Sequence, residues 1–438
     1  MSASTASAME RETMARVSRR LIPFLILCYF IAYLDRVNVG FAALEMNRDL
    51  GLSPTVYAWG AGIFFLAYFI FEVPSNVILE KVGARRWIAR IMLTWGILSG
   101  CMAFVVGPWS LYLVRALLGI AEAGFFPGII LYLTYWFPAT YRARIVGSFM
   151  VAIPVSTVIG APISGLLLGL DGVAGLSGWQ WLFIVEAVPA LVLSAVVLGF
   201  LTDRPADAQW LRPEQRQWLA GRLEEERLAK EAVVHFTLGQ ALSNPRVIGL
   251  GLVYFGIVAS NYGLSFWLPQ IVKGFGLSNV ATGFVTAVPY LFGAVAMVFW
   301  GRHSDRKGER VWHTAGAAMV AAIGLGAGAL GAGPVLTMAL LCFGALGIFG
   351  ALPPFWTLPT ALLSGTAAAG GIALINSIGN LSGFVGPYAV GWVREATGSF
   401  PLALLVLAAL PLAAGLLVLA MGHDPALEQP RDKMAPAA

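Results

Sequence analysis

Long apolar stretches follow one another along almost the whole chain, separated by short polar connections. A helix needs about 20 mainly apolar residues to cross the hydrocarbon core of a bilayer, and about twelve stretches reach that length. The expected spans are residues 21–43, 56–79, 87–106, 108–133, 143–170, 180–201, 246–270, 281–301, 312–332, 334–357, 367–393 and 399–421. They lack the alternation of membrane β-strands, so the pattern predicts an all-α polytopic membrane protein.

The composition agrees with this pattern. Hydrophobic residues make up 58% of the 438 residues and charged residues only 12%, which excludes an ordinary soluble protein of this size. The net charge of +5 needs no nucleic-acid partner, because the basic residues gather at alternate connections, as topology requires. They include Lys81, Arg85, Arg86, Arg142, Arg144, Arg302, Arg306, Lys307 and Arg310. This distribution predicts that both termini are cytoplasmic.

A charged segment, residues 202–244, divides the chain. Its middle has helical spacing, which is consistent with a helix on the membrane surface, although a plain linker fits as well. The first 20 residues are polar and lack the cleavage site of a removable signal peptide. The expected units are a cytoplasmic tail (1–20), a six-helix bundle (21–201), a cytoplasmic linker (202–244), a second six-helix bundle (245–421) and a cytoplasmic tail (422–438).

The two halves share a repeat at a spacing of 225 residues. Asn76, Glu80, Lys81 and Gly83 stand opposite Gly301, Asp305, Arg306 and Gly308. The repeat predicts two pseudo-symmetric halves of six helices that rock about a site at the midplane. Both copies lie in short turns, where pairs of acids and bases can hold the cytoplasmic face closed. The alternative is that the basic residues only anchor the turns on the cytoplasmic side of the membrane. The expected gate residues are Glu80, Lys81, Arg85, Asp305, Arg306 and Arg310.

Several charged residues lie inside the expected spans of the first half. Asp35 and Arg36 are adjacent in the first span, and Arg115 and Glu122 lie two helical turns apart, about 10 Å, on one face of the fourth. A charge at bilayer depth is costly unless paired or hydrated, so such residues mark a substrate or proton pathway. A buried ion-pair network that only fixes helix packing is the alternative interpretation. Glu72 is left open between a gate, helix-end pairing and transport.

This combination of residues suits the movement of an organic anion. An arginine offers a planar pair of donors that can replace the water around a carboxylate. The protonation of a neighbouring Asp or Glu then depends on whether the anion occupies that arginine. Competition for one guanidinium group would therefore couple a proton to the substrate.

Two loops carry a family resemblance. The segment GRHSDRKGER and its weaker copy NVILEKVGARR resemble the signature loop of the major facilitator superfamily. Within that superfamily, YLDRVNVGFAA, FEVPSN and RALLGIAEAGFFPG resemble the anion:cation symporter family, with bacterial tartrate and phthalate permeases as the nearest branch. The resemblance covers essentially the whole chain and implies a bacterial inner-membrane transporter of twelve helices.

The resemblance also implies roles for individual residues. Arg36 resembles the ligand of the substrate carboxylate, Asp35 and Glu122 resemble the proton-carrying acids, and Arg115 resembles the switch partner of Glu122. Further expected substrate contacts are Tyr33, Tyr68, Trp356, Asn376 and Asn380. For the two tyrosines and Trp356, ordinary packing is the alternative.

No feature of the sequence indicates an enzyme or a cofactor. There is no phosphate-binding loop, and the four histidines lie in loops, tails or span edges, so no metal is expected. We therefore expect a monomeric importer of a small organic anion, a tartrate-like dicarboxylate or hydroxy acid, by proton symport with alternating access. An aromatic acid, a sugar acid, export, and sodium in place of the proton stay open as alternatives.

Overall fold

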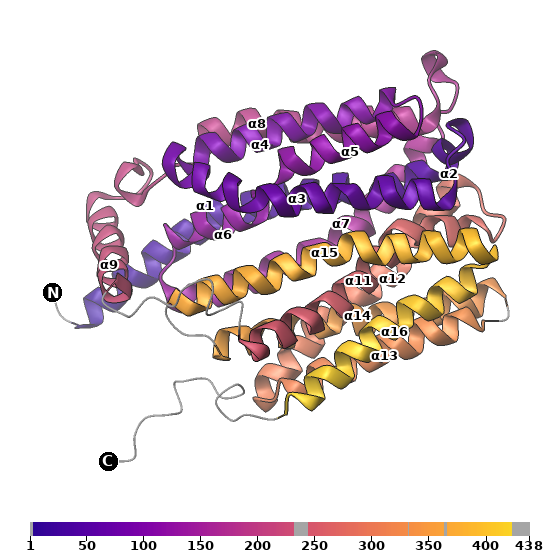
Figure 1. Ribbon diagram of the computed structural model, residues 1–438. Helices are drawn as coiled ribbons and strands as arrows, with labels where there is room; N and C mark the ends of the chain where they lie inside the picture. Colours follow the sequence, from indigo (N-terminus) through magenta and orange to yellow (C-terminus); the bar gives the residue numbers. More distant parts are fainter. Residues whose placement is uncertain (1–2, 232–243, 332, 363–365, 423–438) are drawn as a thin grey trace.

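The computed structural model describes residues 3–231, 244–331, 333–362 and 366–422 and is built from helices (Figure 1). The first half contains α1 (Ala3–Val37), α2 (Val39–Asp49), α3 (Pro54–Val82), α4 (Ala84–Cys101), α5 (Pro108–Glu122), α6 (Phe125–Thr134), α7 (Ala139–Leu168) and α8 (Gly178–Phe200). After α9 (Pro213–Glu231), the second half contains α11 (Pro245–Lys273), α12 (Asn279–Lys307), α13 (Val311–Ala329), α14 (Pro334–Leu362), α15 (Thr366–Thr397) and α16 (Phe400–Ala420). Three short 3-10 turns complete the described helices: η1 (Met102–Phe104), η2 (Val173–Gly175) and η3 (Pro205–Asp207).

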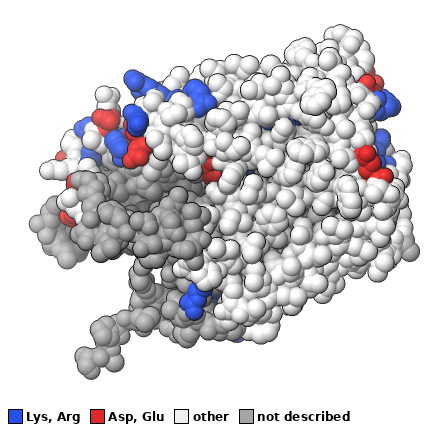
Figure 2. Space-filling view, viewed as in Figure 1, with Lys and Arg blue, Asp and Glu red and all other residues white. Residues whose placement is uncertain are grey.

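The expected membrane architecture is confirmed. Within the described residues, 11 segments are long and apolar enough to cross a membrane, with α1 and α2 forming one of them and α5 and α6 another. Helix α15 is the twelfth segment; its many Gly, Asn and Ser residues lower its hydropathy, and it packs against α3 and α11. Charged residues lie at the two ends of the molecule, and the surface between them is almost without charge (Figure 2).

The two halves meet mainly along two pairs of helices, with a smaller contact of α11 against α1 and α2. Helix α3 runs beside α15, and α7 packs against α12 (Figure 1). At the second contact Gly165 faces Gly283, and a Cβ on Gly283 would lie only 2.5 Å from the carbonyl oxygen of Ala161. Small residues of this kind let the backbones of two helices approach closely in a membrane. The halves therefore touch backbone to backbone at this point.

We name the two ends of the bundle by their contents. The α9 end carries α9 and the start of α1, and the far end carries the turn between α2 and α3 (Figure 1). Helix α1 begins at Ala3, so most of the polar N-terminal tail is helical and continues into the first span. Arg212, which precedes α9, pairs with Glu12 of α1 at 2.5 Å. The α9 segment is thus held against the first half.

One span is broken close to the charged residues. Helix α5 ends at Glu122, and α6 begins at Phe125 after Gly124, whose φ is +83°. Residues with a Cβ rarely adopt that conformation, and here a Cβ would also lie 2.5 Å from the Ser75 hydroxyl oxygen. The break frees backbone polar groups in the middle of the membrane, which is tolerated where a cavity or polar site can satisfy them.

Candidate functional site

Arg36 occupies the centre of a buried polar cluster between the halves. Its guanidinium forms an ion pair with Glu122 at the end of α5. It also donates a hydrogen bond to the hydroxyl of Tyr262 on α11, at 3.2 Å. The rings of Phe64 and Tyr68 lie 5.4 and 5.3 Å from the guanidinium carbon, within cation–π range. Arg36 therefore joins an acid of the first half to a hydroxyl of the second.

Asp35 faces away from these groups. Its carboxylate accepts hydrogen bonds from the indole N–H of Trp95 at 2.7 Å, from the Ser99 hydroxyl at 3.2 Å and from the Asn38 amide at 3.5 Å. Adjacent residues on a helix point about 100° apart, which explains why Asp35 and Arg36 have separate partners. Asp35 is thus held by neutral donors, two of them on α4 and one directly after α1, a set of partners that the sequence pattern did not reveal.

Arg115 is fully buried and is bound to backbone. It donates to the carbonyl oxygens of Gly60 and Ala61, at 3.1 and 3.0 Å, and lies over the ring of Phe64. Its Nη1 finds no hydrogen-bond partner among the described residues. The structure therefore pairs Glu122 with Arg36 rather than with Arg115, and the Nη1 group of Arg115 could still donate a hydrogen bond.

The expected tyrosines both lie in this cluster. The Tyr33 hydroxyl accepts a hydrogen bond from the amide of Asn261 on α11, at 2.9 Å, and its ring stacks on Tyr262. Tyr68 lies against Arg36, as described above. Tyr68 thus flanks the arginine, and Tyr33, which stacks on the Tyr262 ring that Arg36 also contacts, adds a second polar link between the halves.

On the second half, the two expected asparagines contact an acid of the first half. The amides of Asn376 and Asn380 donate to the two carboxylate oxygens of Glu72, at 3.1 and 3.3 Å. The ring of Trp356 packs edge-on against Tyr254, with centroids 4.9 Å apart. Glu72, whose role the sequence left open, therefore bridges α3 and α15.

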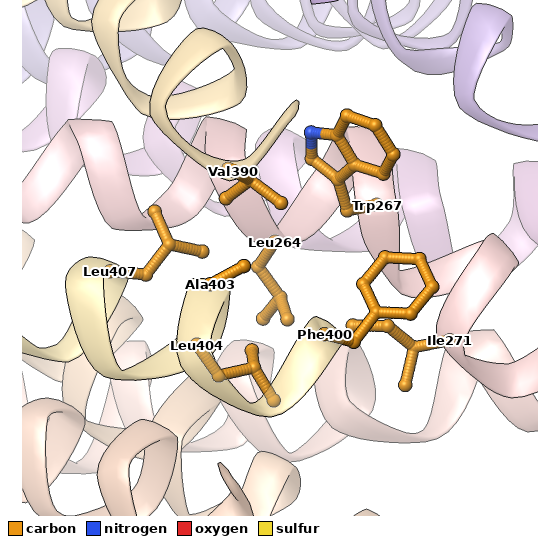
Figure 3. A pocket seen from close by; sticks show the side chains of 9 residues that line it. Leu264, Trp267, Ile271, Val390, Phe400, Ala403, Leu404 and Leu407 are labelled. Carbon is orange, nitrogen blue, oxygen red and sulfur yellow. The ribbon is translucent and has the colours of Figure 1, made fainter. Parts of the chain in front are cut away.

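Other charged and apolar features lie at the edge of this cluster or outside it. Glu186 accepts a hydrogen bond from Ser164 at 2.7 Å and lies within electrostatic range of Asp35. The guanidinium carbon of Arg90 lies 3.8 Å from the ring centroid of Trp87. A small pocket between α11, α15 and α16 is lined by apolar side chains around Trp267 (Figure 3). The Trp267 N–H already donates to the carbonyl oxygen of Pro387. This pocket offers no charge that would hold an anion.

The first expected gate loop pairs within its own half. Gly83 has a φ of +99°, as a tight reversal requires, and the Arg85 backbone N–H donates to the carboxylate of Asp203 at 2.8 Å. Glu80 and Lys81 are exposed at the end of α3. Asp203 comes from the connection before α9, so the loop ties α3 and α4 to that connection.

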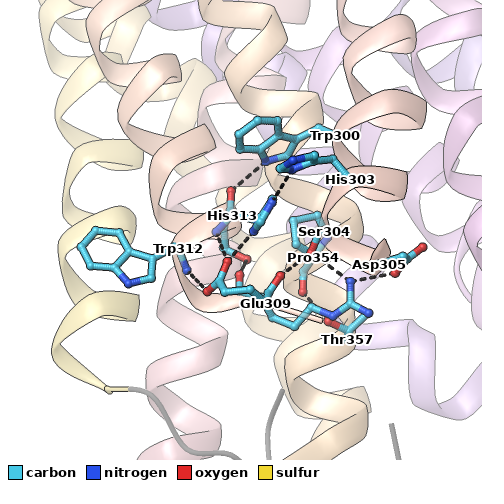
Figure 4. Close-up of polar contacts among 11 residues, drawn as sticks. Trp300, His303, Ser304, Asp305, Glu309, Trp312, His313, Pro354 and Thr357 are labelled. Carbon is cyan, nitrogen blue, oxygen red and sulfur yellow. Dashed lines mark hydrogen bonds and ion pairs between the residues drawn. The ribbon is translucent and has the colours of Figure 1, made fainter. Parts of the chain in front are cut away.

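The second expected gate loop contains a denser network (Figure 4). Arg310 donates to Asp305 at 2.7 Å and to Ser304 at 2.9 Å, while Arg306 is exposed. Gly308 has a φ of +69°, which matches the expected turn. This network fixes the turn between α12 and α13.

Sequence reasoning missed the histidines beside this loop. His303 and His313 are hydrogen-bonded ring to ring at 2.8 Å, and the other ring nitrogen of His313 contacts Glu309 (Figure 4). The spacing of Glu309 and His313, one helical turn, was the available signal. Burial raises the pKa of Glu309, but hydrogen bonds from His313 and from two backbone N–H groups outweigh it, so that pKa lies below the usual value.

The sequence as a whole agrees with these features. The family model of the Major Facilitator Superfamily matches residues 25–387. The chain belongs to this superfamily. The resemblance seen in its signature loops is thereby confirmed, and the protein is a membrane transporter and not an enzyme.

Similar proteins refine the assignment. The transporter is 54% identical over 416 residues to a protein of Agrobacterium vitis provisionally named as a tartrate transporter, covering 95% of this chain and 92% of that protein. It is 42% identical over 410 residues to the metabolite transport protein NicT, also provisionally named, of Pseudomonas putida, with 93% and 94% covered. These relatives agree with the resemblance to anion:cation symporters.

Solved structures agree with the fold. A bacterial homologue of the human lysosomal transporter Spinster, in an inward-facing conformation, aligns with a TM-score of 0.76 and 15% identity over 95% of this chain and 98% of the other. A D-xylose-proton symporter aligns with a TM-score of 0.68 and 16% identity over 91% and 96%. At these identities the likeness concerns the fold alone.

Proposed function

We propose that this superfamily transporter imports a small organic anion, a tartrate-like dicarboxylate or hydroxy acid, together with protons. The observation that carries the proposal is the Arg36–Glu122 pair at the contact between the halves. A guanidinium with two parallel donors suits a carboxylate, and an ionisable acid already on that guanidinium suits proton exchange. The names of the Agrobacterium vitis relatives support tartrate as the first substrate to test.

The proposed coupling is a competition for Arg36. In the empty transporter Glu122 is ionised and bound to the guanidinium. When a substrate carboxylate takes its place, the released Glu122 carboxylate accepts a proton, because an unpaired charge at bilayer depth is costly. Release of the substrate lets Glu122 return to Arg36 and give up the proton on the same side. Asp35 serves as a second proton carrier, and Arg115 receives Glu122 or substrate in another state.

An aromatic acid is the second candidate. The guanidinium of Arg36 is surrounded by the rings of Phe64, Tyr68 and Tyr262, which could stack on a substrate ring. Tyr33, Trp356, Asn376 and Asn380 would line either substrate. The two candidates differ in whether a second carboxylate or a ring fills the space beyond Arg36.

The proposed cycle is alternating access by rocking of the halves. Contacts between the halves gather at the far end, where Glu395 of α15 accepts hydrogen bonds from Ser53 and from the backbone of Thr55, at 2.8 and 2.7 Å. The distribution of the basic connections supports a cytoplasmic location for the α9 end and for both termini. The far-end contacts would then close the periplasmic side, while Glu80, Lys81, Arg85, Asp305, Arg306 and Arg310 act at the cytoplasmic side. One chain holds both halves, so a monomer suffices.

Uptake by liposomes containing the purified protein tests this proposal. Tartrate, phthalate, galactonate and hydroxyphenylacetate are supplied with and without an inward proton gradient. We expect tartrate to accumulate only when the gradient is present. Accumulation of phthalate instead would favour the aromatic candidate, and uptake of none of the four acids under any gradient would overturn the proposal.

A further inference from the structure

Glu72 is an acid of the first half held by neutral donors of the second. Its side chain is buried, with 6% of its surface exposed. Each carboxylate oxygen accepts one amide hydrogen bond, from Asn376 and Asn380 respectively. These asparagines are four residues apart and so lie on the same face of α15. Together they form a two-pronged site that holds one carboxylate.

A second carboxylate of the protein is held nearby in the same manner. Glu122 occupies the guanidinium of Arg36, and Tyr68 lies against that guanidinium. Glu72 follows Tyr68 by one helical turn, a rise of about 6 Å along α3. Two carboxylates of the protein thus occupy two sets of donors at the contact between the halves. The rise of one helical turn between Tyr68 and Glu72 is similar to the distance between the two carboxylates of a small diacid.

We propose that Glu72 takes the place, in the empty transporter, of the second carboxylate of a dicarboxylate substrate. This inference rests on the function proposed above and adds the basis of substrate choice. One substrate carboxylate replaces Glu122 on Arg36, and the other replaces Glu72 on the amides of Asn376 and Asn380. The released Glu72 carboxylate takes one proton from the solution, which removes its repulsion from the bound diacid.

The arrangement distinguishes diacids from monoacids. A monocarboxylate fills only the Arg36 position and leaves the contact between Glu72 and α15 in place. A dicarboxylate must break that contact and regains hydrogen bonds to the same amides. Glu72 therefore lowers the affinity for diacids alone. Its removal changes the ratio of the affinity for diacids to the affinity for monoacids.

The test measures binding of tartrate and of the monocarboxylate glycerate to the purified full-length protein by calorimetry. Replacing Glu72 by Gln keeps its size but replaces charge-assisted hydrogen bonds with weaker neutral ones. For E72Q we expect about tenfold tighter binding of tartrate, equivalent to about 1.4 kcal/mol, with the affinity for glycerate unchanged. The matched control is E225Q on exposed α9, which should bind both acids like the wild type.

A second variant keeps the inference testable if E72Q is unstable. The double replacement of Asn376 and Asn380 by Ala removes the donors and should weaken tartrate binding while sparing glycerate. If E72Q changes both affinities equally, or neither, while the wild type binds tartrate, the inference fails and the proposed function stands. If the wild type binds neither acid, both fail, and the two cases are thereby distinguished.

Discussion

Arg36 is the residue on which the proposed substrate contact depends. Replacing it by Ala removes both donors to the carboxylate, and hydrogen bonds to charged groups contribute about 1.5–3 kcal/mol each. We expect R36A to bind tartrate at least about 100-fold more weakly than the wild type. R36K keeps the charge but loses the planar fork, so its binding should be intermediate. Calorimetry measures both, and tartrate binding by R36A at wild-type affinity would contradict the assignment.

Glu122 is expected to affect coupling rather than binding. E122Q cannot give up a proton, so it should still exchange external for internal substrate but should no longer accumulate it under a proton gradient. The measurement compares counterflow with gradient-driven uptake in the same liposomes. E225Q on exposed α9 provides the control, because Glu225 pairs with Arg222 and lies outside the membrane-spanning helices. Accumulation by E122Q at the wild-type level would remove Glu122 from the coupling.

The sequence predicts some of these residue contacts and not others. Asp35 and Arg36 stand out because charges are rare in apolar spans, and helical geometry alone separates their directions. The partners of Glu72 could not be found this way, since Asn376 is 304 residues away in the chain. The roles of Trp95, which donates to Asp35, and of Tyr262, which accepts from Arg36, could not be predicted for the same reason: ordinary aromatic residues in apolar spans give no local signal.

At the scale of elements, hydropathy predicts where spans lie but not where they break. Residues 108–133 form one continuous apolar stretch, yet α5 and α6 are separate helices. The reason is the close packing of Gly124 against Ser75 of α3, which is a tertiary contact. Similarly, α1 extends to Ala3 because its polar part packs against α9 by way of Arg212.

The start of α13 should be sensitive to acid. The pKa of Glu309 is lowered in the folded protein, so its ionised form contributes stability above the ordinary value of 4.5 and loses it as the pH falls through the lowered pKa. We expect E309Q to reduce stability at neutral pH by less than about 1 kcal/mol, because the group is partly exposed. Thermal unfolding against pH measures this difference, which should vanish in acid. A loss of stability for E309Q that persisted in acid would contradict the explanation.

At the scale of the whole molecule, the far-end contacts should bias which side is open. E395A removes the acceptor for Ser53 and Thr55, so the halves should separate more often at that end. A cysteine at position 58, which is buried beside Gly391, should then react faster with an impermeant maleimide from the far side. R48A is a suitable control, because Arg48 lies at the same end and pairs with its chain neighbour Asp49, within the first half. Unchanged reactivity of the cysteine in E395A would show that these hydrogen bonds do not hold the end closed.

The contact of Gly165 with Gly283 has a consequence for how such a molecule can vary. Because neither glycine has a side chain, α7 and α12 can change their crossing angle at this contact without any change of side-chain rotamer. Any larger residue at position 283 would act as a spacer against the carbonyl of Ala161 and hold the two helices apart. A single added methyl group would therefore shift the equilibrium between the states open to either side of the membrane, with no change in any residue that contacts the substrate.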